Sequence, residues 1–328
     1  MREAALFFLA AAGIVAAAEG AAPAGGVAGS PSAGAETVVP AAGLTRLRIE
    51  GISGTIEISG GAPGEVRVLS TYGGRKPRPL PVSVVAEGAD LLVRPLAGGR
   101  DSPRRLEVRV PANLPVRVRT DDARVSVRGT SGALEAAGRG LRIEAEGLEG
   151  SLSADLEGGS LVAIGLGDRV EVTGRDATAR VAGALGDAVF RLLGSSQVSV
   201  SGVGGALDVD LDEGSLAVLG VEGTATVRQR GGKAKIEGLR RGGRLLLHGT
   251  SVLLARSEGE VVLEGDRDLR VESLDASLRG EMAGGTLTGA DLRGGATVGG
   301  SGPARVDLEG VAGPVVVEGA LIEVSIRE

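Results

Sequence analysis

The chain has 328 residues and a formal net charge of −6, and it contains 57 glycines, one histidine and no cysteine or tryptophan. Without cysteine it can form no disulfide, no thiolate metal site and no cysteine nucleophile. Its negative charge argues against nucleic-acid binding over the whole surface. The glycines follow no Gly-X-Y period, so a collagen triple helix is excluded.

Residues 1–18 have the pattern of a secretory signal peptide. Arg2 precedes a short apolar run, and small residues follow it up to Ala18, which are the three parts of such a signal. The alternative is an uncleaved N-terminal membrane anchor, although the run is short for a membrane span. We expect an exported protein in the periplasm, on the outer surface or outside the cell, with no integral membrane span after signal removal.

Residues 19–40 are nearly all Ala, Gly, Pro and Ser, a composition that is typical of a flexible linker because it cannot bury a core. Residues 41–328 are expected to form one domain. Its first unit is the segment Arg46–Ile58, in which two stretches of alternating apolar residues flank the turn Gly51–Gly54.

Residues 70–105 interrupt the pattern that follows. Two strand-like runs occur in them, Val82–Val85 and Leu91–Val93. We expect a hairpin or a lateral arm, inserted between early turns of a repeat. The segment is also rich in proline, which lacks the N–H that a sheet ladder needs; its prolines are Pro77, Pro79, Pro81, Pro95 and Pro103.

Glycine recurs from Gly129 to Gly238 at intervals of 18 residues, with a single interval of 19. A fixed short period is the signature of a solenoid. In each unit apolar residues alternate with mostly polar ones, as at Leu134 and Ala136 after the first glycine and at Ile143 and Ala145 before the second. This period of two indicates half-buried strands, because a helix needs apolar positions three and four apart.

The sequence therefore predicts an all-β fold, a single-stranded parallel β-helix (β-solenoid) with right-handed coils of about 18 residues. Turns of the type Gly-Φ-x-Gly, where Φ is apolar, separate the strands, as at Gly147–Gly150. After Gly238 the period loosens but persists to the end. The columns of apolar residues are expected to stack from coil to coil, and one of them contains Leu134, Leu152, Val170, Ala188, Leu207 and Ala225.

These motifs resemble the bacterial putative-adhesin domains of unknown function, which are exported Gly-rich β-solenoids. The resemblance rests on Arg46–Ile58, on the Val-Pro strand Leu106–Pro111 and on the serial Gly-Φ-x-Gly turns after Gly129. It covers residues 44–328. It implies a β-solenoid and, through the family name, surface adhesion; it brings no catalytic or binding residues with it.

Three acidic or titratable groups invite a chemical interpretation. The strand Asp208–Glu213 places three carboxylates on one outward face, which is either a solvated face or a Ca²⁺ site. Asp121 and Asp122 form the best carboxylate pair for an enzyme acting on polysaccharides, but both fall in an expected turn. The lone His248 has no partner for a triad or a zinc site. We therefore expect no catalytic residues, no metal and no cofactor.

The window from Val66 to Arg119 contains 11 basic and four acidic residues, whereas the chain as a whole is acidic. Such polarity would orient this end toward anionic envelope polysaccharide, lipid headgroups or another envelope protein; the alternative is an ordinary solvated edge. Neutralising Arg75, Lys76 and Arg78 should abolish retention on anionic polysaccharide or liposomes at low salt. The candidate binding residues are Arg75, Lys76, Arg78, Arg100, Arg104 and Arg105.

Together these observations favour a non-enzymatic envelope or cell-surface protein that acts as an adhesin-like binding or scaffold module. A periplasmic accessory protein of an envelope-stress or membrane-sensing system is the second interpretation. A β-helix enzyme acting on polysaccharide is the third, and short coils without long loops leave little room for its substrate groove.

Overall fold

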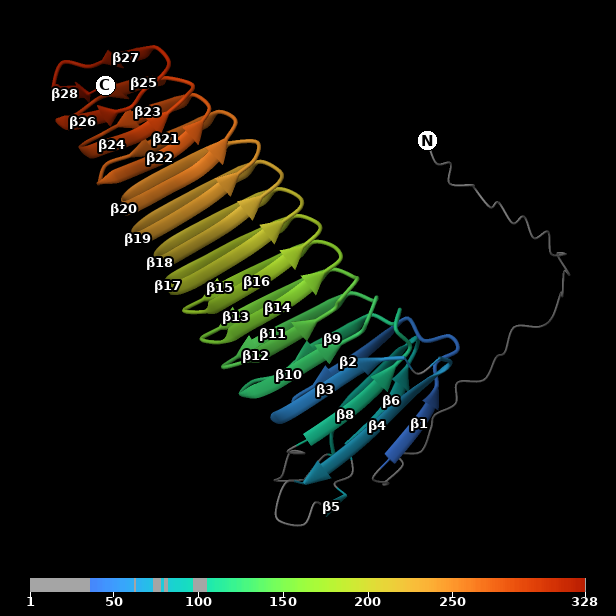
Figure 1. Ribbon diagram of the computed structural model, residues 1–328. Coiled ribbons are helices and arrows are strands. Elements are labelled where there is room, and N and C mark those ends of the chain that lie inside the picture. Colours follow the sequence, from blue (N-terminus) through green and yellow to red (C-terminus); the bar gives the residue numbers. More distant parts are fainter. Residues whose placement is uncertain (1–35, 62, 73–77, 80–81, 97–104, 328) are drawn as a thin grey trace, which may run out of the picture.

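The computed structural model describes residues 36–61, 63–72, 78–79, 82–96 and 105–327. Within this part of the chain the regular structure consists of 28 β-strands and no helix. The strands follow one another in short coils that stack into a long rod, with the first strands at one end and the last at the other (Figure 1). The predicted parallel β-solenoid is thus confirmed.

Each coil contributes to two stacks of strands, which enclose the core between them. All neighbours in the first stack are parallel except β6 and β7. In order along the rod it consists of β6 (Val82–Glu87), β7 (Asp90–Pro95), β2 (Arg46–Glu50), β9 (Val116–Arg119), β11 (Leu134–Arg139), β13 (Leu152–Glu157), β15 (Val170–Arg175), the first halves of β17 (Ala188–Val203), β18 (Leu207–Val221), β19 (Ala225–Leu239) and β20 (Gly243–Glu258), then β21 (Val261–Gly265), β23 (Leu278–Met282), β25 (Ala296–Gly300) and β27 (Val315–Glu318).

The second stack is parallel from β8 onward, and β1 and β4 are added to its end antiparallel. The short strand β5 (Arg78–Pro79) pairs with the end of β4. In order along the rod the stack consists of β1 (Glu36–Pro40), β4 (Glu65–Tyr72), β8 (Arg105–Val110), β3 (Gly54–Gly60), β10 (Ala123–Arg128), β12 (Arg142–Glu146), β14 (Ser160–Leu166), β16 (Thr178–Ala184), the second halves of β17 to β20, then β22 (Leu269–Asp275), β24 (Gly285–Leu292), β26 (Ala304–Glu309) and β28 (Ile322–Arg327).

The register of the strands confirms the predicted columns. Leu134 pairs with Leu152, and the same column continues coil by coil to Ala225. In the second stack the column of Ile143 continues in the same way to Ala234. The members of both columns are buried. Each buried Leu or Val stabilises the fold by about 1.5–3 kcal/mol, so the rod has a thin but continuous apolar core.

The Gly-Φ-x-Gly segment contributes to the core as well as to the turn. Its apolar residue points inward at the corner of the coil. The sequence pattern placed this residue in a turn and did not predict that it is buried. The glycine before it adopts positive φ, as Gly147 does at +61°, a conformation that glycine takes without a Cβ clash. The buried corner column consists of Leu148, Leu166, Ala184, Val203, Val221 and Leu239.

The segment expected as an arm closes the N-terminal end of the rod. Strands β6 and β7 form the predicted hairpin, but β7 pairs with β2 and extends the first stack along the rod axis. Strand β8 extends the second stack beside β3. The coil of β2 and β3 therefore lies between two coils that come later in the chain, so β6, β7 and β8 extend the rod at this end.

The described residues begin inside the segment expected as a linker. Its last five residues, Glu36–Pro40, form β1 and pair with β4, so the folded domain starts earlier than residue 41. The predicted signal peptide lies outside the described residues. In the part of the chain that the structure describes, no helix has the length and apolarity needed to cross a membrane.

The loosening of the glycine period after Gly238 has a local cause. At the corner that follows the second stack, the left-handed position is taken by Arg256, Ser273 and Asp291, with φ between 50° and 55°. Gly310 then restores glycine at +63°. The backbone path is retained while the residue type changes. The glycine period is therefore lost in these coils although the coils themselves continue.

Candidate binding surfaces

The outer faces of both stacks carry rows of charged side chains that pair between neighbouring coils. Arg124 contacts Glu144 at 2.6 Å, and Arg244 contacts Glu264 at 2.7 Å. Exposed pairs of this kind contribute little to stability, about 0–1 kcal/mol each. Their effect is to neutralise much of the outer surface, so residues without an ion pair mark the places where charge is available to a partner.

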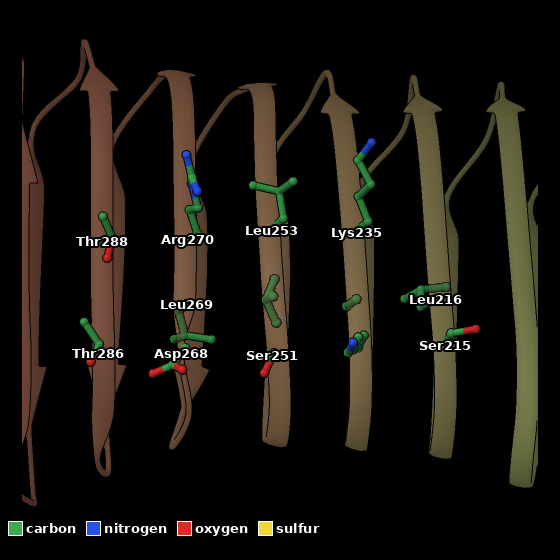
Figure 2. A pocket seen from close by; sticks show the side chains of 13 residues that line it. Ser215, Leu216, Lys235, Ser251, Leu253, Asp268, Leu269, Arg270, Thr286 and Thr288 are labelled. Atoms are coloured by element: carbon green, nitrogen blue, oxygen red, sulfur yellow. The ribbon is translucent and has the colours of Figure 1, made fainter.

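An open depression of about 810 Å³ crosses the outer face of the second stack over β18, β19, β20, β22 and β24. Figure 2 shows outward side chains in two rows across these parallel strands. The register explains the rows, because equivalent residues of successive coils stand side by side. One row contains Lys235, Leu253, Arg270 and Thr288, and the other contains Ser215, Lys233, Ser251, Asp268 and Thr286.

The depression combines free charge with an apolar centre. Among the described residues Lys233 makes no ion pair, whereas Lys235 contacts Glu237 at 2.6 Å and Arg270 contacts Glu272 at 2.5 Å. Leu253, in the middle, is half-buried. A surface of this kind can contact an elongated ligand through hydroxyl groups, one free ammonium and an apolar patch. Its residues are far apart in the chain, so the sequence pattern gave no signal for this depression.

Most of the predicted basic site lies outside the described residues. This holds for Arg75, Lys76, Arg100 and Arg104, and only the backbone of Arg78 is described, paired with Tyr72. The remaining residue of the six is described and exposed.

That residue, Arg105, is held by two carboxylates, Glu57 at 2.9 Å and Glu107 at 3.0 Å. The hydrogen bond to Glu57 and the charges of both carboxylates raise the pKa of the Arg105 guanidinium. Its charge is therefore compensated within the fold.

Beside Arg105 a depression of about 430 Å³ alternates cations and anions. Arg109 lines it without an ion pair among the described residues, while Arg128 contacts Glu146 at 3.3 Å. The described part of the basic window thus contributes single free cations rather than a continuous positive surface.

The acidic strand lies on the outer face of the first stack, as predicted. Asp208 contacts Arg228 at 3.2 Å and Arg191 at 3.7 Å, and Asp212 contacts Arg230 at 3.8 Å. Among the described residues no three His, Asp or Glu side chains come together as a metal site would require. Asp208 and Asp212 are thus compensated by arginines of neighbouring coils.

The other candidate groups have structural surroundings. Asp121 accepts hydrogen bonds from the backbone N–H of Arg139 at 2.9 Å and from its guanidinium at 3.0 Å. The backbone hydrogen bond and then the guanidinium lower the pKa of Asp121. Asp122 follows in the turn with φ of +52°, and His248 is exposed on β20. These groups do not converge on a common point of the surface.

The chain matches no family model and no curated protein. Several solved structures align with it, among them the following two. One is a putative cell adhesion protein from Clostridium sporogenes, with 11% identity over 90% of this chain and 99% of that chain and a TM-score of 0.18. The other is a putative adhesin from Bacteroides fragilis, with 10% identity over 90% of this chain and 98% of that chain and a TM-score of 0.19. The fold assignment rests on the strand register of this chain itself.

Proposed function

We propose that this protein is a non-enzymatic, exported binding or scaffold module of the adhesin-like kind, which acts at the cell surface through its outer faces. The observation that supports this proposal best is the depression in Figure 2, which crosses five strands of the second stack. Equivalent residues along each row of a parallel stack repeat about every 4.8 Å. A surface with that repeat suits contact with an extended polymer better than enclosure of a small molecule.

The absence of catalysis is part of the proposal. A nucleophile or general base needs an orienting partner within hydrogen-bond distance. Asp121 is committed to Arg139, and His248 has no acid partner among the described residues. The depression holds Ser251 and Asp268 on adjacent coils but no histidine. Its residue types are those of a contact surface.

Cell fractionation and mild protease treatment of intact cells test the proposal. With an antibody to the rod, we expect the protein to be exported and digested on intact cells. Protection until the outer membrane is opened would contradict the surface role and favour the periplasmic accessory role. A cytoplasmic location would contradict export itself.

A second experiment addresses the depression. Lys233→Glu together with Leu253→Glu should reduce attachment of the purified protein to its own cells by about tenfold, since both changes fall on exposed or half-buried positions of one contact surface. The matched control is Arg142→Glu with Val262→Glu, which changes the net charge by the same amount at exposed or half-buried outward positions away from the depression. Equal attachment of the two double variants would reject the depression as the contact surface.

A further inference from the structure

One corner of the rod changes character in the later coils. Where the chain leaves the second stack, a residue with positive φ is required in every coil. Glycine occupies this position in seven successive coils, from Gly129 at +60° to Gly238 at +74°. In the next three coils the position is held by Arg256, Ser273 and Asp291. They follow Ala255, Glu272 and Ala290, which pair with one another in register.

A side chain at this position has a conformational penalty. The left-handed conformation is unfavourable for a residue other than glycine, and glycine is compatible with this corner, since it returns at Gly310. Such departures gather at ligand sites, where the side chain has a use that offsets the strain. Three successive departures at one corner therefore point to a use for these side chains.

The three side chains face solvent and line a cavity. The residue after each of them points into the core: Ser257, Leu274 and Leu292 are buried. The cavity has a volume of about 560 Å³ and runs along the corner over four coils. We call it the corner groove. Its charged and hydroxyl side chains form two rows, Arg256, Ser273 and Asp291 in one and Glu258, Asp275 and Arg293 in the other.

The second row is neutralised within the fold. Glu258 contacts Arg240 at 2.6 Å, and Asp275 contacts Arg293 at 2.9 Å. These pairs hold the wall of the groove in place. An arginine has five N–H donors, and a carboxylate occupies at most two of them in a bidentate pair, so Arg293 still has donors to offer.

Two of the three side chains in the first row have no hydrogen-bond or ion-pair partner within the described residues. Arg256 pairs with Glu237. Within the described residues, Ser273 and Asp291 make neither a hydrogen bond nor an ion pair through their side chains, and both are exposed. A free hydroxyl and a free carboxylate therefore stand on adjacent coils, about 4.8 Å apart along the rod. Together they can accept from, and donate to, hydroxyl groups.

We propose that the corner groove binds a segment of a neutral glycan chain. Asp291 accepts hydrogen bonds from sugar hydroxyls, Ser273 donates or accepts one, and the unused N–H groups of Arg293 donate to sugar oxygens. Three carboxylates and two guanidiniums line the groove, and all but Asp291 are paired. This near-neutral mixture of donors and acceptors suits a ligand rich in hydroxyls and without net charge, and the direction of the groove suits a linear chain.

This assignment rests on the proposed binding function of the protein, and it specifies neutral glycans as the class of partner. The test uses the full chain and an array of immobilised neutral oligosaccharides, with uronic-acid oligosaccharides and polylysine as charged probes. The variant is Ser273→Gly with Asp291→Gly, which gives the corner the residue that the earlier coils have and is expected to fold. The control is Asp122→Gly, at another exposed left-handed position with φ of +52°.

We expect the parent protein to bind neutral glycans. The affinity should fall by about tenfold in the double variant, which corresponds to the loss of one to two good hydrogen bonds. In the control it should change less than twofold. Equal binding of the double variant, absence of any neutral glycan bound, or preferential binding of polylysine would each overturn the assignment. If no glycan binds while the protein still attaches to cells from the surface, the groove assignment fails and the proposed function stands. If glycan binds but the protein is protected inside the cell, the surface role fails instead.

Discussion

The coils from Gly129 to Gly238 and the coils that follow share one architecture. They differ in the residue type at the corner that follows the second stack. In both regions the inward columns are buried and in register. At the corner after the second stack the earlier coils use glycine, and the later coils use Arg256, Ser273 and Asp291 with the same sign of φ. The inward residues therefore determine the path of the coil. The corner residue can instead carry a solvent-exposed side chain, at a moderate conformational cost.

The largest expected effect tests whether the core is equivalent in the two regions. Leu207→Asp and Leu263→Asp place a charge at positions that are 1% and 0% exposed, and each should lower the stability of the local stack by about 3–5 kcal/mol. Thermal unfolding by circular dichroism measures the loss. Leu219→Asp, 56% exposed on the outer face, serves as the control, and unchanged unfolding of either core variant would reject the column assignment.

A smaller effect is expected when a later corner residue is placed in an earlier coil. Gly147→Ser should destabilise by about 1–2 kcal/mol, the cost of left-handed φ for a side chain. A Cβ at Gly147 meets no atom within 4 Å, so no steric clash adds to this cost. A loss much above that range in thermal unfolding would mean that the corner depends on more than φ.

The reverse exchange should have the opposite sign. Ser273→Gly removes the left-handed strain at φ of +51°, which slightly outweighs the greater freedom of glycine in the unfolded chain. We expect a gain of up to about 1 kcal/mol, measured by the same thermal unfolding. A loss of stability would show that Ser273 supports the coil and would weaken the contrast between the two regions.

The smallest effect concerns pH and a turn just before the regular coils. Because the pKa of Asp121 is lowered in the folded state by Arg139, its contribution is fully present above its ordinary pKa of about 4 and is lost as the pH falls through the lowered value. The unfolding temperature of the parent protein should exceed that of Asp121→Asn at neutral pH, and the two should converge in strong acid. A difference that persists unchanged at the lowest pH would contradict an ionic origin.

Much of the rod could be predicted because its information is local. The pairing of Leu134 with Leu152 and Val170 follows from a constant spacing, and alternation fixes which side chains point inward. The buried corner position of Leu148 was missed, because a single apolar residue between glycines has no period of its own. The corner at Arg256 was missed for a related reason: the sequence marks a left-handed residue only when it is glycine.

The end of the rod and its binding surfaces could not be predicted, because they depend on which coils become neighbours. Nothing in the order of the sequence places β7 beside β2, because four strands, β3 to β6, lie between them in the chain. The depression of Figure 2 likewise joins Ser215 to Thr288 across successive coils. The pairing of Asp208 and Asp212 with arginines of adjacent coils depends on the same neighbour relations.

The position of the first coil has a consequence for how the chain folds. Leu47 lies between Leu91 and Val116, both of which are synthesised later. The β2–β3 coil therefore has no neighbour to stack on until β7 and β8 are present, and it gains its second neighbours only with β9 and β10. We expect this first block, with its long-range contacts, to form as one cooperative unit in a slow step. Every later coil adds to an existing edge through local contacts only. The blue end of Figure 1 thus depends on contacts between distant parts of the chain, whereas the coils toward the red end depend on their immediate neighbours.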